Sequence, residues 1–197
     1  MQTTDVTVAA TAIADGELVI YPTETVYGLG ADALDADAVE RVFEAKRRPR
    51  EKPVSMAVDS VAAAALYTEP DGRERAFMDA FLPGPVTVLL ERGERVPDVL
   101  TAGRDRVGVR VPDSEIALDF LNAVDTPVTA TSANVSGDPS ARRIEDIQCP
   151  VRDAAAVALD GGTTPGGQGS TVVDPSTGEI HRRGPLADDI EAWLAEH

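Results

Sequence analysis

Both lysines of the chain lie in one short segment, K46-R-R-P-R-E-K52, whereas the other sixteen basic residues are arginines. Lysine binds phosphate oxygens as a compact point charge, and arginine binds them through a planar fork of donors. The segment is therefore a candidate phosphate-binding site. A solvated helix end, where cations oppose the helix macrodipole, or a nucleic-acid patch would produce the same cluster.

Three other polar segments each follow a stretch that we expect to be a strand. Residues 21–30 hold Thr23, Glu24, Thr25 and Tyr27, residues 129–141 hold Ser132, Asn134, Ser136 and Ser140, and residues 161–169 hold five glycines before Ser170. Ligands of open sheets lie across the carboxyl ends of strands, and small donors suit a polyanion such as a nucleoside triphosphate. Turns, helix caps and flexible connectors are the alternative interpretation of each segment.

The usual nucleotide-binding signatures are absent from these segments. The chain has no GxxxxGK[ST] motif, and Gly28-Leu29-Gly30 lacks the third glycine of a dinucleotide fingerprint. Spacing alone therefore indicates an anion-binding α/β protein and no more.

The elements that must position these segments alternate between strands and helices. We expect strands at residues 18–21, 54–58, 86–91, 107–111, 128–131, 154–159, 170–174 and 179–182, the last two forming a hairpin. We expect helices at residues 7–14, 37–47, 61–66, 73–82, 115–123 and 188–196. In the strand at 107–111, Val107, Val109 and Val111 share one face, and Gly108 and Arg110 share the other. This order predicts an α/β or α+β fold with an open sheet covered by helices.

Length and composition exclude several classes of protein. A chain of 197 residues predicts one domain, 1–197, and a hydrophobic content of 43% excludes a disordered chain. The longest apolar run, residues 61–67, is far shorter than the roughly 20 residues of a membrane span. The first residues include acids and no basic start, so we expect no signal peptide and a cytoplasmic location. A single cysteine, Cys149, and two histidines, His181 and His197, exclude an internal disulfide and a histidine metal cluster.

The charge balance is strongly acidic, with a net charge of −16. High net charge combined with few lysines favours a halophilic protein, because concentrated salt screens the self-repulsion. An ordinary acidic cytosolic protein with biased codon usage is the alternative.

A family resemblance covers nearly the whole chain, from about residue 18 to residue 184. The segments that carry it are P22-T-E-T-V-Y-G-L-G-A-D-A, K46-R-R-P-R-E-K-P, L82-P-G-P-V-T-V-L-L, G108-V-R-V-P, T131-S-A-N-V-S-G-D-P-S, S170-T-V-V-D and R182-R-G. In this order they resemble the YrdC family, whose members are threonylcarbamoyl-AMP synthases. The resemblance implies an α/β fold: an open twisted mixed sheet flanked by helices, with a concave ligand face.

The resemblance also implies a nucleotidyltransferase reaction. L-threonine, bicarbonate and ATP, with Mg²⁺, give threonylcarbamoyl-AMP and pyrophosphate, and a downstream tRNA threonylcarbamoyl transferase complex consumes the product. The implied catalytic residues at the triphosphate are Lys46, Arg48 and Lys52. Those implied for ATP are Arg48, Lys52, Ser132, Asn134, Ser140 and Arg182, with Arg106 near the nucleotide. Those implied for threonine are Thr23, Thr25, Tyr27, Arg110, Ala130 and Ser170.

These residue types suit the implied chemistry. A carbamate oxygen attacks the α-phosphorus, which mainly requires positioning and neutralisation of spread negative charge. No histidine base is needed, and Arg110 is able to fork onto the threonine carboxylate. Two departures stand out: Ala57 occupies a position where many longer relatives have a histidine, and we expect the short, single-domain form of the family rather than the form with a second C-terminal domain.

Two rival functions share the fold. A related domain that makes carbamoyl-adenylate in hydrogenase maturation sits in a larger chain with acylphosphatase-like and zinc segments, which are absent here. A non-enzymatic RNA-binding or ribosome-associated paralogue would use the basic segment at 46–52. The net charge of −16 and the scarcity of aromatic residues near basic ones argue against direct tRNA binding.

Overall fold

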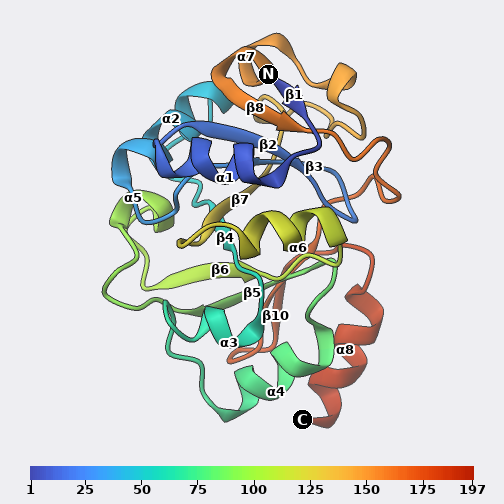
Figure 1. Ribbon diagram of the computed structural model, residues 1–197. Helices are drawn as coiled ribbons and strands as arrows, with labels where there is room; N and C mark the ends of the chain where they lie inside the picture. Colours follow the sequence, from blue (N-terminus) through green and yellow to red (C-terminus); the bar gives the residue numbers. More distant parts are fainter.

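The computed structural model describes residues 1–197 and contains one ten-stranded mixed sheet flanked by helices (Figure 1). The strands are β1 (Gln2–Thr3), β2 (Leu18–Pro22), β3 (Tyr27–Gly30), β4 (Ser55–Ala57), β5 (Val86–Glu91), β6 (Arg106–Arg110), β7 (Val128–Ser132), β8 (Ala155–Leu159), β9 (Thr171–Asp174) and β10 (Glu179–Arg182). Their order across the sheet is β1-β8-β2-β3-β7-β4-β6-β5-β9-β10. The predicted open mixed sheet is confirmed.

The helices are α1 (Val6–Ala14), α2 (Ala36–Lys46), α3 (Val61–Ala64), α4 (Gly72–Phe81), α5 (Asp98–Thr101), α6 (Glu115–Asn122), α7 (Cys149–Ala154) and α8 (Ala187–Glu196), with a 3₁₀ turn at Ile144–Asp146. They cover both faces of the sheet around β2. Val19 and Tyr21 of β2 pack with α1 and α6 in one core cluster. Leu18 and Ile20 point the other way and pack with α2 and α7. The helix at the carboxyl end of the chain, α8, packs against the largest cluster, which also includes α4 and strands β5 and β6.

The alternation expected for β6 is present. Val107 and Val109 are buried in the largest core cluster together with Val88 and Leu90 of β5. Gly108 and Arg110 lie on the opposite face, which borders a cavity. One face of the strand thus anchors it in the core, so that the other face presents its arginines at fixed positions.

Strand β3 corrects the prediction that residues 21–30 form a loop after a strand. Residues 27–30 pair antiparallel with both β2 and β7. The sequence did not indicate this strand, because it contains Gly28 and Gly30 and glycine is generally disfavoured in strands. Here glycine is required, since a Cβ at Gly28 would lie 2.9 Å from the ring of Tyr21 and one at Gly30 would lie 3.1 Å from it. The short elements β1, α5 and α7 were likewise not predicted.

Helix α2 ends one residue earlier than predicted. Its first turn is capped by the Asp35 carboxylate, which accepts from the Asp37 N–H. Its last residue is Lys46, and Arg47 adopts the left-handed conformation with φ of 50°. That turn breaks the helix and begins the loop at residues 47–53, which runs to the cavity. No helix of the chain is long and apolar enough to cross a membrane.

Candidate active site

A cavity of about 580 Å³ opens on the sheet face that carries Arg110. Its lining includes residues of every strand from β2 to β10 except β8. Six cationic side chains contribute to the wall, namely Arg48, Lys52, Arg104, Arg106, Arg110 and Arg182. No carboxylate does so. In a chain whose net charge is −16, a third of the 18 basic residues therefore face one cavity.

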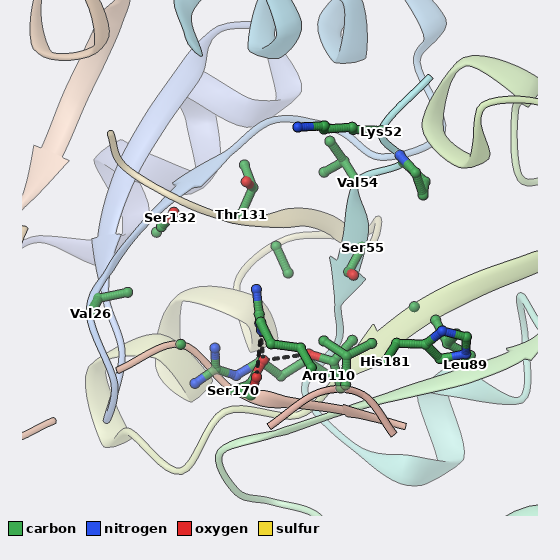
Figure 2. A pocket seen from close by; sticks show the side chains of 18 of the residues that line it. Val26, Lys52, Val54, Ser55, Leu89, Arg110, Thr131, Ser132, Ser170 and His181 are labelled. Atoms are coloured by element: carbon green, nitrogen blue, oxygen red, sulfur yellow. Dashed lines mark hydrogen bonds between the residues drawn. The ribbon is translucent and has the colours of Figure 1, made fainter. Parts of the chain in front are cut away.

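The loop at residues 47–53 is folded so that two of its cations, Arg48 and Lys52, face this cavity. Arg48 donates from Nε to the Lys52 carbonyl at 2.9 Å and from Nη2 to the Pro53 carbonyl at 2.8 Å. Figure 2 shows Lys52 on the side of the cavity opposite Arg110 and Ser170. Burial lowers the pKa of Arg48 from its usual value, and the nearby charge of Arg182 lowers it further. An anion in the cavity would relieve this repulsion.

Lys46 lies beneath the cavity and does not line it. Its side chain is 1% exposed. Its Nζ donates to the carbonyl oxygens of Ser132 and Asn134, the latter at 2.8 Å. Burial, followed by the charge of Arg48, lowers the pKa of Lys46 to about 7. The structure therefore separates Lys46 from Arg48 and Lys52, with which the sequence grouped it.

The loop after β7 divides into contacting and supporting residues. Ser132 and Ser140 line the cavity. Asn134 is buried, and its side-chain nitrogen donates to the carbonyls of Val135 and Asp138, both at 2.8 Å. Asn134 thus fixes the shape of the loop and leaves the two serines at its surface.

Arg110 is held by the turn after β2. Its Nη2 donates to Glu24 Oε1 and to Thr25 Oγ1, each at 2.7 Å. The Thr25 hydroxyl also forms a 2.8 Å hydrogen bond with the Thr23 hydroxyl. Thr23 and Ala130 line the cavity. Thr25 does not line it, and its hydroxyl contacts Arg110, which does. The turn therefore orients the arginine.

Ser170 and Arg182 form a second polar corner of the cavity. Arg182 donates from Nε to the Ser170 carbonyl at 2.9 Å and from Nη2 to the Ser170 hydroxyl at 3.0 Å. The same hydroxyl is 2.8 Å from the Thr87 hydroxyl, and Figure 2 marks hydrogen bonds at Ser170. Burial and the charge of Arg110 lower the pKa of Arg182.

The glycine-rich segment does not form the phosphate cradle that its composition suggested. Only Gly169 and Ser170 at its end line the cavity. The rest folds against the turn after β2: Gly166 N–H donates to the Glu24 carbonyl at 3.0 Å, and a Cβ there would lie 2.8 Å from the Thr25 backbone. Tyr27 is fully buried outside the cavity, and its hydroxyl donates to the Gly162 carbonyl at 2.8 Å. Tyr27 therefore anchors this segment.

Several lining residues were not predicted from the sequence, and two of them, Arg104 and His181, have ionisable side chains. Arg104 lies just before β6, and His181 lies in β10 at an irregularity of the pairing with β9. Ile180 pairs with Val173 and Arg182 with Val172, so His181 is an extra residue, and both His181 and Arg182 face the cavity. Sequence alternation would put them on opposite faces, and no local signal marks the bulge.

The charge of Arg106 is neutralised by ion pairs, and Ala57 lies away from the cavity wall. Arg106 lies at the cavity but pairs with Glu74 at 2.6 Å and with Asp174 at 2.9 Å. Ala57 is buried in the core cluster that contains Phe120 and does not line the cavity.

Comparison with known proteins identifies the family. The model of the Sua5/YciO/YrdC family, described as telomere recombination, matches residues 11–184. The chain belongs to this family. The resemblance predicted from the sequence motifs is therefore confirmed.

Individual relatives of the family agree with this. A threonylcarbamoyl-AMP synthase of Pyrococcus abyssi is 42% identical over 168 residues, which are 85% of this chain and 49% of that protein. One of Vibrio parahaemolyticus is 31% identical over 176 residues, which are 88% of this chain and 95% of that protein. The crystal structure of P. abyssi Sua5 complexed with L-threonine matches with a TM-score of 0.82 at 41% identity, covering 86% of this chain and 50% of that chain. The chain thus spans about half the length of its Pyrococcus relative.

Proposed function

We propose that this protein is a threonylcarbamoyl-AMP synthase that converts L-threonine, bicarbonate and ATP to threonylcarbamoyl-AMP and pyrophosphate. The observation that carries the proposal is the gathering of six cations around one cavity in a strongly acidic chain of this family. Relatives named for this activity support it at 42% and 31% identity. The product would serve the threonylcarbamoyl modification of tRNA through a separate transferase complex.

The triphosphate would lie against Arg48, Lys52 and Arg182, with the hydroxyls of Ser132 and Ser140 as further donors. Nucleotidyl transfer requires little from the protein beyond holding the reacting groups in line and neutralising charge. Partly desolvated cations that repel one another suit that task, because a polyanion lowers their mutual repulsion.

Threonine would lie on the side of the cavity opposite Lys52, next to Arg182 and near Arg110, Thr23, Ala130 and Ser170. Arg110 would bind its carboxylate, and the hydroxyls of Thr23 and Ser170 would bind its polar groups. The carbamate formed from the amine and bicarbonate would then face the α-phosphorus. Breaking the bond to the β-phosphate releases pyrophosphate, and its charge stays neutralised by Arg48 and Lys52.

Mg²⁺ would enter as part of the ATP complex. Mg²⁺ prefers carboxylate, phosphate and water oxygens, and the cavity wall contains no carboxylate. The chain also has no group of three or more metal-ligating side chains. We therefore assign no protein ligand to the ion and derive no step through it.

Pyrophosphate release tests the proposal. We expect release that requires threonine and bicarbonate together, with serine as the nearest competitor, since it lacks only a methyl group worth about 1 kcal/mol of burial. Arg182→Ala should lose activity, whereas Arg183→Ala should keep it, because Arg183 is exposed and pairs with Asp188 and Glu191. Release with ATP alone would contradict the proposal.

A further inference from the structure

The six cations of the cavity fall into two classes according to whether a carboxylate pairs with them. Arg106 and Arg110, both on β6, form ion pairs with Glu74 and Asp174 and with Glu24 respectively. The other four, Arg48, Lys52, Arg104 and Arg182, form no ion pair, and the arginines among them donate to carbonyls or a hydroxyl. The cavity therefore has a region of net positive charge and a region in which the charge is cancelled.

The pair of Arg110 and Glu24 is buried and incompletely hydrogen-bonded. The two side chains are 11% and 14% exposed, and their nearest atoms are 2.7 Å apart. Arg110 Nε and Glu24 Oε2 are both buried without a partner. A buried ion pair repays its desolvation only when its remaining groups are satisfied. Stability alone therefore does not account for Glu24, and a role in the cavity does.

The turn that carries Glu24 is fixed independently of Arg110. The backbone carbonyl of Glu24 accepts from Gly166 N–H at 3.0 Å, and the carbonyl of Thr25 accepts from the Thr164 hydroxyl at 3.3 Å. The hydroxyls of Thr23 and Thr25 close the turn. The turn that carries the carboxylate is thus held next to Arg110 by its own hydroxyls and by one neighbouring segment, residues 164–166.

We propose that Glu24 is a specificity-determining residue that cancels the charge of Arg110, so that this end of the cavity accepts a zwitterionic amino acid and rejects phosphate. The inference rests on the proposed function for the identity of the two substrates. Without Glu24, Arg110 and Arg182 would be two neighbouring unpaired arginines, a usual phosphate site. An amino acid zwitterion carries no net charge, so neutralisation of Arg110 by Glu24 changes its electrostatic binding energy little. With Glu24, Arg110 keeps Nη1, which donates to no protein group, for a carboxylate.

Pyrophosphate binding to the full chain, measured by calorimetry without Mg²⁺, tests the proposal without any need for threonine. The wild-type chain should bind one pyrophosphate. Glu24→Gln should bind a second, and Glu24→Gln combined with Arg110→Met should return to one. Glu40→Gln makes the same change of net charge at an exposed ion pair with Arg50 and should behave as wild type. A single site of unchanged affinity in Glu24→Gln would overturn the proposal.

Threonine binding supplies the second measurement. In Glu24→Gln, saturating pyrophosphate should raise the apparent Kd for threonine by about tenfold, whereas in wild type and Glu24→Asp it should change Kd by less than about twofold. If Glu24→Gln does not fold, the double variant Glu24→Gln with Arg110→Met, whose net charge equals that of wild type, is measured instead. It should lose threonine binding and keep the wild-type pyrophosphate Kd, and a tenfold weaker Kd would overturn the proposal. If wild type binds no threonine but Glu24→Gln gains a pyrophosphate site, the proposed function fails and the role of Glu24 stands.

Discussion

Lys46 Nζ donates to the carbonyl oxygen of Asn134 at 2.8 Å and thereby joins the end of α2 to the loop after β7. The same nitrogen donates to the carbonyl of Ser132, and the Lys46 carbonyl accepts from Ser136 N–H at 2.8 Å. The two loops that supply Arg48 and Ser132 to the cavity are thus tied together by one buried lysine. We interpret Lys46 as a positioning residue of the site.

Replacement of Lys46 by methionine should destabilise the fold. The change leaves two carbonyls without their donor at a site 1% exposed, which costs about 2–4 kcal/mol in the free energy of unfolding. Chemical denaturation measures this loss. Lys52→Met removes an exposed lysine of the same segment and should change the free energy of unfolding by less than about 0.5 kcal/mol.

The pH dependence of stability follows from the same residue. The folded-state pKa of Lys46 is lowered from 10.5 to about 7. Between these two values the unfolded chain binds one more proton than the folded chain, so stability rises with pH across that window. Wild type should therefore gain stability relative to Lys46→Met as the pH rises from 7 to 10. A constant difference between the two would show that Lys46 stays charged in the fold.

Lys52 should contribute to ATP affinity. Its ammonium faces the cavity without an ion pair, so Lys52→Ala should raise the Kd for ATP by about tenfold. Arg50 lies two residues away in the same loop and pairs with Glu40 outside the cavity, so Arg50→Ala is the matched control and should bind ATP normally. Equal Kd values for ATP in both variants would show that Lys52 is a solvated loop charge that does not contribute to ATP binding.

Arg110 should contribute to threonine affinity. Arg110→Lys keeps the charge but is unable to serve Glu24, Thr25 and a substrate carboxylate from one planar group. The KM for threonine should rise by tenfold or more, and the KM for ATP by less than about threefold. Steady-state kinetics with each substrate varied in turn separates the two. An unchanged KM for threonine would place Arg110 outside the substrate site.

High salt should stabilise the protein, since the net charge of −16 repels itself most in dilute buffer. The Debye length falls from about 10 Å at 0.1 M to about 3 Å at 1 M salt. Melting temperature and activity should therefore both rise in KCl from near zero into the molar range. A melting temperature that is flat or falls with KCl would remove the halophilic interpretation and leave the family assignment intact.

Several parts of the fold were predictable because they follow short-range rules. The faces of β6 follow from alternation along Val107, Gly108, Val109 and Arg110, and β5 and the hairpin at the end of the sheet follow from apolar runs bounded by turns. Strand β3 was not predictable, because the ring of Tyr21 that requires its glycines comes from a neighbouring strand.

The candidate site likewise contains residues that the sequence predicted and contacts that it did not. Residue type directed attention to Arg48, Lys52 and Ser132, and the family resemblance directed it to Arg182; all four line one cavity. The burial of Lys46 beneath a loop 86 residues away, the pairing of Glu24 with Arg110 across another 86 residues, and the bulge at His181 depend on tertiary packing. Local sequence carries no record of such distant contacts.

The formation of a labelled adenylate tests the proposed function most directly. The protein is incubated with ATP, Mg²⁺, bicarbonate and radiolabelled L-threonine, and the nucleotides are separated. Threonylcarbamoyl-AMP synthesis predicts a labelled adenylate that disappears when bicarbonate or ATP is omitted and that is lost in Arg182→Ala but not in Arg183→Ala. Absence of any labelled adenylate from protein that binds both ATP and threonine would contradict it.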